Sequence, residues 1–194
     1  MTTFQDQEDD VIFSEPIKAK DECKVKIIFA ELSKPWTVKQ GVTGYEGQQY
    51  PVMKLTLQII DTDVECEHED AKPRLVIEDR FCLEKYPCMK EDKLQWIERQ
   101  KLYDLESAFG FEPLYVVNEE RVEPFITKNG NKVAPKIAGV KHKLNPDFAF
   151  TYFDNNGIPK VDNWVDKELL AKVEVEKSET YGDKNVIKRY KRLA

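Results

Sequence analysis

Two segments of the sequence interleave aromatic rings with lysines and arginines. Bases stack on aromatic rings for about 1–3 kcal/mol each, while basic side chains follow the phosphates. The spacing of these residues is therefore typical of a surface that binds single-stranded nucleic acid. Any one ring could instead be a core side chain, because aromatic side chains bury large areas. The first segment contains Lys34, Trp36, Lys39, Tyr45 and Tyr50, and the second contains Tyr181, Lys184, Lys188, Arg189 and Tyr190.

A metal site is the second chemistry to consider, because the chain has four cysteines and two histidines. Structural zinc sites favour two cysteines separated by about two to four residues. Cys82 and Cys88 are separated by five residues, and Cys66 and His68 lie in an acidic stretch. We therefore interpret the cysteines as reduced thiols, and we predict no metal and no other cofactor.

An enzymatic function has less support from the sequence. The eight glycines form neither a Gly-x-x-x-x-Gly-Lys-Ser/Thr nor a Gly-x-Gly-x-x-Gly string, and His68 and His142 lie in charged contexts. Carboxylates could serve a metal-dependent nuclease, but in a chain with 34% charged residues such groups arise by chance. We predict that the protein is not an enzyme. The nuclease alternative would use Asp61, Asp63, Glu78 and Asp79.

The 194 residues carry a net charge of −6, which by itself disfavours a polyanionic partner. Two acidic segments account for −11, because residues 1–22 carry −5 and residues 61–70 carry −6. The other 162 residues therefore carry +5, and two basic stretches hold much of this charge. This distribution permits a nucleic-acid partner. The stretches contain Lys128, Lys132, Lys136, Lys141 and Lys143, and Lys184, Lys188, Arg189, Lys191 and Arg192.

The composition, with 41% apolar residues, is typical of one globular domain. No run of apolar residues is longer than four, whereas a membrane-spanning helix needs about 20. Residues 1–22 lack a basic start followed by an apolar stretch, so we expect no secretory signal. We predict an acidic, partly disordered N-terminal tail over residues 1–22 and a folded domain over residues 23–194.

Hydrophobic periodicity predicts the elements that position these residues. Alternating apolar residues favour strands over residues 23–30, 51–60 and 74–83, joined by a long loop over 33–50 and an acidic turn over 61–70. Residues 92–109 have helical spacing, with Asp92 as the expected cap and Gly110 at the end. Prolines and Asn-Gly turns divide residues 111–163 into short strands and loops. Residues 170–176 and 185–193 then favour a hairpin around Tyr181.

This order predicts a mainly β fold: a five-stranded OB-like barrel with one helix between strands three and four. An irregular β-rich insertion at about residues 111–163 interrupts it. In an OB-fold, strands two and three, with the loops that join strands one to two and four to five, bind oligonucleotides. The two segments that interleave aromatic and basic residues fall in these two loops, so we expect both to flank one groove.

The last hairpin also resembles part of a known family. Its residues read Leu-Ala-Lys-Val-Glu-Val-Glu-Lys over 170–177 and Glu-Thr-Tyr-Gly-Asp-Lys-Asn-Val-Ile-Lys-Arg-Tyr over 179–190. They resemble the closing hairpin of phage-encoded single-stranded-DNA-binding proteins with an OB-fold, and residues 74–81 and 100–111 look like the strand and helix that precede it there. Two features differ: the insertion is long, and the acidic tail is at the N-terminus, whereas such binders often carry it at the C-terminus.

Residue pattern and resemblance together predict a single-stranded-DNA-binding protein of DNA replication or recombination, with little sequence preference. Its partners would be single-stranded DNA and, through the acidic tail, replication or recombination proteins. We expect a cytoplasmic location in a prokaryotic cell or a phage-infected host, with no membrane partner and with a homo-oligomer left open. The alternatives are a virion or assembly interaction protein without enzymatic activity and, after that, the metal-dependent nuclease.

Overall fold

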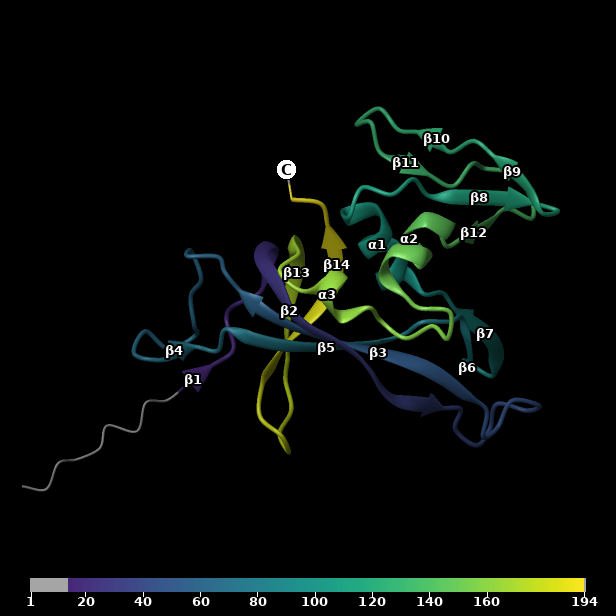
Figure 1. The fold of residues 1–194 in the computed structure, drawn as a ribbon. Coiled ribbons are helices and arrows are strands. Elements are labelled where there is room, and N and C mark those ends of the chain that lie inside the picture. The colour runs from purple at the N-terminus through teal and green to yellow at the C-terminus, as the bar shows by residue number, and fades with distance from the viewer. Residues whose placement is uncertain (1–13, 194) are drawn as a thin grey trace, which may run out of the picture.

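The centre of the molecule is a five-stranded antiparallel sheet with the order β14-β13-β2-β3-β5 (Figure 1). We describe residues 14–193 in a computed structural model of the chain. A mainly β fold is therefore confirmed. The strands of this sheet are β2 (Lys20–Thr37), β3 (Gln49–Ile59), β5 (Val76–Cys82), β13 (Glu168–Glu176) and β14 (Lys184–Lys191).

Smaller elements surround this sheet. Most of them come from the segments between β5 and β13, and none of the helices formed by residues 14–193 has the length and apolar character that a bilayer crossing requires. The short strands are β1 (Ser14–Glu15), β4 (Lys72–Pro73), β6 (Tyr86–Lys90), β7 (Lys93–Ile97), β8 (Leu114–Val117), β9 (Glu120–Val122), β10 (Phe125–Ile126), β11 (Lys132–Val133) and β12 (Lys141–Lys143). The helices are α1 (Gln100–Ala108), α2 (Pro146–Tyr152) and α3 (Val161–Trp164).

Buried and exposed side chains alternate along β2 as predicted up to Ile27, and beyond this residue the alternation is reversed. Val25 and Ile27 are fully buried. The register with β3 shifts between Ile27 and Phe29, as at a β-bulge, and Phe29 is 43% exposed. Strict alternation over residues 23–30 predicts that Phe29 faces the core like Val25 and Ile27. This prediction is wrong, because a bulge adds one residue and reverses the side-chain alternation beyond it.

The predicted loop over residues 33–50 is shorter than expected. β2 continues to Thr37 and β3 begins at Gln49, with Trp36 opposite Tyr50, so the loop contains only residues 38–48. Pro35 favours a loop, but the prolonged pairing of β2 with β3 outweighs that local signal. Gly41, Gly44 and Gly47 lie in the remaining loop, as predicted, and all have positive φ.

The predicted helix over residues 92–109 is shorter than expected. Residues 86–97 form a β6–β7 hairpin, and Glu91 and Asp92 occupy its turn with φ values of 51° and 59°. Two consecutive left-handed residues form the two-residue turn that matches the twist of a hairpin, so Asp92 does not cap a helix. α1 begins at Gln100, and its predicted end at Gly110 is confirmed, since the amide of Gly110 donates to the carbonyl of Ser107 at 3.0 Å.

The insertion contains two helices in addition to the expected short strands. Asn145 caps α2, because its side-chain oxygen accepts from the amide of Asp147 at 2.9 Å. Phe148 and Trp164 from α2 and α3 are fully buried in the main core. Residues 114–143 instead form short strands beside α1, away from the central sheet (Figure 1).

Helix α1 connects to both β5 and β14 through two buried carboxylates. Asp79 of β5 accepts from Tyr190 Oη at 2.7 Å and from Lys101 Nζ at 2.5 Å. Asp104 of α1 accepts from Arg189 at 2.6 and 2.8 Å. The first and last strands of the sheet order are thus linked by side chains.

The predicted acidic tail is described only in part, since residues 1–13 lie outside the described residues. Ser14 and Glu15 form β1, which pairs with β4 in parallel, and β2 begins at Lys20. Residues 20–22 therefore belong to the central sheet.

Candidate nucleic-acid interface

Five aromatic residues gather where β2 and β3 meet β6 and β7. We call residues 36–50 together with β6 and β7 the aromatic arm. The ring centroid of Trp36 lies 4.6 Å from that of Tyr86, and the centroid of Tyr45 lies 5.3 Å from that of Trp96 in an edge-on contact. Tyr50 is 9% exposed and Trp96 is 41% exposed. The arm therefore has buried rings that support it and outer rings that solvent reaches.

The arm has a small hydrophobic core of its own, separate from the main core. Val38, Val42 and Tyr50 are buried there, and Trp36 and Tyr45 pack against them. Burial raises the pKa of the Tyr86 hydroxyl, as expected for a ring that leaves water. Predicted site residues Trp36, Tyr45 and Tyr50 are thus brought together, with Tyr50 as support.

Two lysines of the predicted site lie within three residues of Trp36 in the chain. Lys34 and Lys39 are exposed, and within the described residues neither has a carboxylate in ion-pair range. Their charge is therefore available to an anionic partner. Stacking surfaces next to unpaired cations are the combination that single-stranded nucleic acids require.

Trp96 is not among the site residues predicted from the sequence. The helical spacing over residues 92–109 includes it, whereas in β7 it lies opposite Pro87 and contacts Tyr45. The signal that could have identified it is Asp92, since aspartate tolerates positive φ and favours turns.

The second predicted segment, around Tyr181, has a different environment. Tyr181 is 92% exposed, and no other ring among residues 14–193 packs against it. Lys184 lies 3.5 Å from Glu176, and Lys188 lies 3.8 Å from Glu174. Both lysines are thus partly neutralised by β13, although exposed ion pairs of this kind are weak.

Arg189 and Tyr190 bond to the buried carboxylates Asp104 and Asp79 beside α1 and do not form part of the hairpin surface. Tyr190 is 3% exposed, and burial, followed by the charge of Asp79, raises the pKa of its hydroxyl well above the usual value. Arg189 donates to Asp104, which raises the pKa of the guanidinium. The ring of Tyr190 is therefore not accessible for stacking, whereas about half of the Arg189 side chain remains exposed.

The two predicted segments lie at opposite ends of the long strand β2. Trp36 pairs with Tyr50 near one end of β2, whereas Val173, close to the second segment, pairs with Lys20 at the other end. The structure does not bring Tyr181 next to the aromatic arm.

The carboxylates of the nuclease alternative have separate partners. Asp61 bonds to Lys20, which lowers the pKa of its carboxyl group, and Asp79 accepts from Lys101 and Tyr190. Glu78 pairs with Arg80. In the part of the chain that the structure describes, no three histidine, cysteine or acidic side chains form a group that could hold a metal ion.

The four cysteines are free thiols. Burial raises the pKa of the Cys23 thiol to about 11 and also raises that of Cys82. Both therefore remain protonated at neutral pH, as expected for structural cysteines.

Comparison with family models, with curated proteins and with solved structures found no match to this chain. The resemblance of the last hairpin to phage-encoded single-stranded-DNA-binding proteins stays a prediction. Functional inference therefore rests on the arrangement of the residues themselves.

Proposed function

We propose that the protein binds single-stranded DNA without catalysing a reaction, with the aromatic arm as the main contact surface. The observation that carries this proposal is the contact between Tyr45 and Trp96, two rings that solvent reaches. Lys34 and Lys39 are near Trp36 in the chain and have no carboxylate in ion-pair range among residues 14–193. Each base that stacks there would contribute about 1–3 kcal/mol.

The fixed position of the rings supports this proposal. Tyr45 and Trp36 pack on buried residues of the arm, so they lose little rotamer freedom when a base stacks on them. Lysines on the same surface would contact phosphates and displace counterions, which makes binding depend on salt.

The order of the strands supports an OB-like barrel as the fold behind this function. The strands β2, β3, β5, β13 and β14 would be its five strands, with α1 between the third and the fourth. Tyr190 and Asp79 would then link the first and last strands of the sheet order where the barrel closes. The arm would correspond to the loop between strands one and two, a common contact site in such folds.

The hairpin around Tyr181 would supply weaker contacts at the other end of β2. Tyr181, Lys184 and Lys188 are exposed there, although acids of β13 accompany both lysines. A role in DNA replication or recombination would follow from binding of single strands without sequence preference.

Tryptophan fluorescence tests this proposal. Titration with oligo-dT should quench the emission of Trp36 and Trp96, since both lie on the arm, whereas Trp164 is fully buried. Affinity should fall steeply as salt increases and should be much lower for duplex DNA. Equal affinity for duplex, or binding that salt does not affect, contradicts the proposal.

A matched substitution locates the binding surface. Tyr45→Ala should weaken binding of oligo-dT, whereas Phe150→Ala should not. Phe150 is a suitable control because it is 76% exposed and lies under Lys160, at 4.7 Å from Nζ to the ring centroid, outside the arm.

A further inference from the structure

A large cleft lies between helix α1 and the insertion. Its volume is about 1340 Å³, above the range of about 300–1,000 Å³ that is usual for small-molecule sites. One wall comes from α1 and the end of β14, and the other from residues 130–134 and from β12. The shape fits a segment of a polymer better than a small metabolite.

Both basic stretches of the sequence meet at this cleft. Lys132 and Lys141 of the insertion line one wall, and Arg189, Lys191 and Arg192 line the other. In total seven lysine and arginine side chains line the cleft, against four carboxylates. The cleft therefore has an excess of three positive charges, which favours an anionic occupant.

Ion pairs neutralise only part of this charge. Four of the seven cations have a carboxylate partner: Lys132 pairs with Glu112, Arg189 with Asp104, Lys85 with Glu98 and Lys191 with Glu22. Arg99, Lys141 and Arg192 have no carboxylate partner among the described residues. These three cations are the ones that remain available to phosphates.

Hydrogen bonds to neutral acceptors position the Arg99 side chain, so they do not offset its positive charge. Its guanidinium donates to Tyr103 Oη at 3.1 Å and to the carbonyl of Leu83 at 3.2 Å, and both acceptors are neutral. Arg192 lies over Gly110, where an added Cβ would be 3.8 Å from Nη1. A positioned guanidinium can donate two hydrogen bonds to one phosphate.

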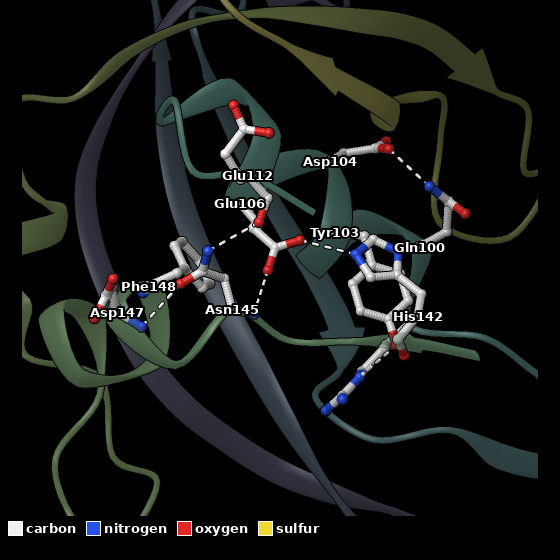
Figure 2. A network of polar contacts seen from close by, with 10 residues as sticks. Gln100, Tyr103, Asp104, Glu106, Glu112, His142, Asn145, Asp147 and Phe148 are labelled. Atoms are coloured by element: carbon white, nitrogen blue, oxygen red, sulfur yellow. Dashed lines mark hydrogen bonds and ion pairs between the residues drawn. The ribbon is translucent and has the colours of Figure 1, made fainter. Parts of the chain in front are cut away.

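A buried polar network joins the two walls, as Figure 2 shows. Glu106 of α1 is fully buried; its carboxylate accepts from the amide of Asn145 at 2.5 Å and lies 3.0 Å from His142 Nε2. The ring of His142 stacks on Tyr103 with centroids 3.6 Å apart, and Tyr103 Oη donates to the carbonyl of His142 at 2.8 Å. The network therefore fixes β12 against α1 and holds the cleft open in one shape.

The cleft reaches the residues that flank the aromatic arm. Lys85, Glu98 and Arg99 line the cleft and also flank the β6–β7 hairpin in sequence. Lys85 Nζ lies 5.9 Å from the centroid of the Trp96 ring. A strand that stacks on Trp96 would thus pass Lys85 and reach Arg99 without leaving the protein surface.

We propose that this cleft binds the phosphate backbone of the single-stranded DNA whose bases stack on the aromatic arm. This inference rests on the proposed function and extends it, because it assigns the insertion the role of a second wall for the strand. Binding there depends on charge rather than on base identity, since cations that contact phosphates carry no sequence information.

A pair of double variants tests the cleft. Lys141→Gln with Arg192→Gln removes two unpaired cations of the cleft. Lys128→Gln with Lys136→Gln removes two exposed cations of the insertion that do not line it. Both doubles change the net charge equally. The probe is an oligo-dT of about 30 nucleotides, longer than the site of a single OB fold.

The cleft double should lose about 25-fold in affinity at about 0.1 M salt, and its salt slope should fall by about 1.4, the value for two phosphate contacts on a single strand. The control double should stay within about 2-fold of the unmodified protein, and all melting temperatures should agree. Equal losses of affinity in the two double variants would contradict the proposal that the cleft binds the phosphate backbone, and would leave the proposed function intact. An unmodified protein that does not bind oligo-dT overturns the proposed function, and the cleft with it.

Discussion

The two ends of β2 both have aromatic residues next to lysines, but they hold these residues differently. At one end, the rings of the aromatic arm contact one another and cover a small core. At the other end, Tyr181 is 92% exposed. Similar sequence patterns thus produce one ordered surface and one isolated side chain. Local composition does not distinguish them, because neighbours from β6 and β7 make the difference.

This difference has an energetic consequence for binding. A ring that is already packed loses little conformational entropy when a base stacks on it, whereas an isolated side chain must be ordered at that moment. We therefore expect the arm to dominate the affinity. Four substitutions test this comparison, in decreasing order of expected effect.

Tyr50→Ala should have the largest effect, because Tyr50 is a buried residue at the base of the arm. Truncation of a buried aromatic side chain costs about 3–5 kcal/mol of stability, and less where the site can collapse. We expect a clear decrease in melting temperature together with weaker binding of oligo-dT. An unchanged melting temperature would contradict the view that Tyr50 supports the arm.

Tyr190→Phe should have the second largest effect. It tests β14, the strand that follows the Tyr181 hairpin. Tyr190 lies on the same strand as Lys184 but is buried, and its hydroxyl donates to Asp79 at 2.7 Å. Loss of this hydrogen bond should decrease the free energy of unfolding by about 1–3 kcal/mol in urea denaturation. DNA affinity should not change, and Tyr181→Phe is the control.

The same substitution has a pH signature. The pKa of Tyr190 is raised in the folded state, so its contribution to stability is present below the unfolded pKa of about 10 and is lost as the pH rises above it. Denaturation curves between neutral pH and about pH 11 should therefore show an alkaline loss of stability that is smaller for Tyr190→Phe. An identical loss in both proteins would assign it to other groups.

Trp96→Ala should affect binding instead of stability. The ring is 41% exposed and contacts Tyr45 from the outer side of the arm. We expect a loss of about 1–3 kcal/mol in the free energy of oligo-dT binding, measured by fluorescence anisotropy of a labelled strand. A decrease in melting temperature without loss of affinity would show that Trp96 belongs to the core of the arm.

Tyr181→Ala should have the smallest effect, because this ring has no packed neighbour to fix it. The expected loss of binding free energy is below about 1 kcal/mol, and the melting temperature should not change. A loss as large as that of Trp96→Ala would mean that the two ends of β2 contribute equally.

Sequence patterns predicted the five strands of the sheet well, since alternation over residues 23–27 or 170–176 is a local property. The patterns failed where the same apolar residues fit both the spacing of a helix and the alternation of a strand. Leu94 and Ile97 fit a helical stripe that continues to Leu102, but the Glu91–Asp92 turn makes residues 93–97 a strand. For the candidate interface, the sequence places Trp36 and Tyr45 in one segment, whereas the contact of Tyr45 with Trp96 depends on that hairpin.

The cleft shows why the rest could not be predicted. Both basic stretches were visible in the sequence, but Lys141 and Arg192 share a cleft only because Glu106 and His142 hold β12 against α1. Such long-range placement leaves no periodic signal. The bulge at Phe29 is a second example, since one extra residue reverses the alternation without a local marker.

The link between Tyr190 and Asp79 has a consequence for the behaviour of the protein at high concentration. β5 and β14 are the edge strands of the sheet, and exposed edges are templates for pairing between chains and for aggregation. The hydrogen bond of Tyr190 to Asp79 links a residue of one edge strand to a residue of the other. Two residues of α1 bond to the same pair, since Lys101 donates to Asp79 and Asp104 accepts from the amide of Tyr190. At these positions the edge residues are bonded within the molecule, which makes this part of each edge a poorer template for a strand of a second copy.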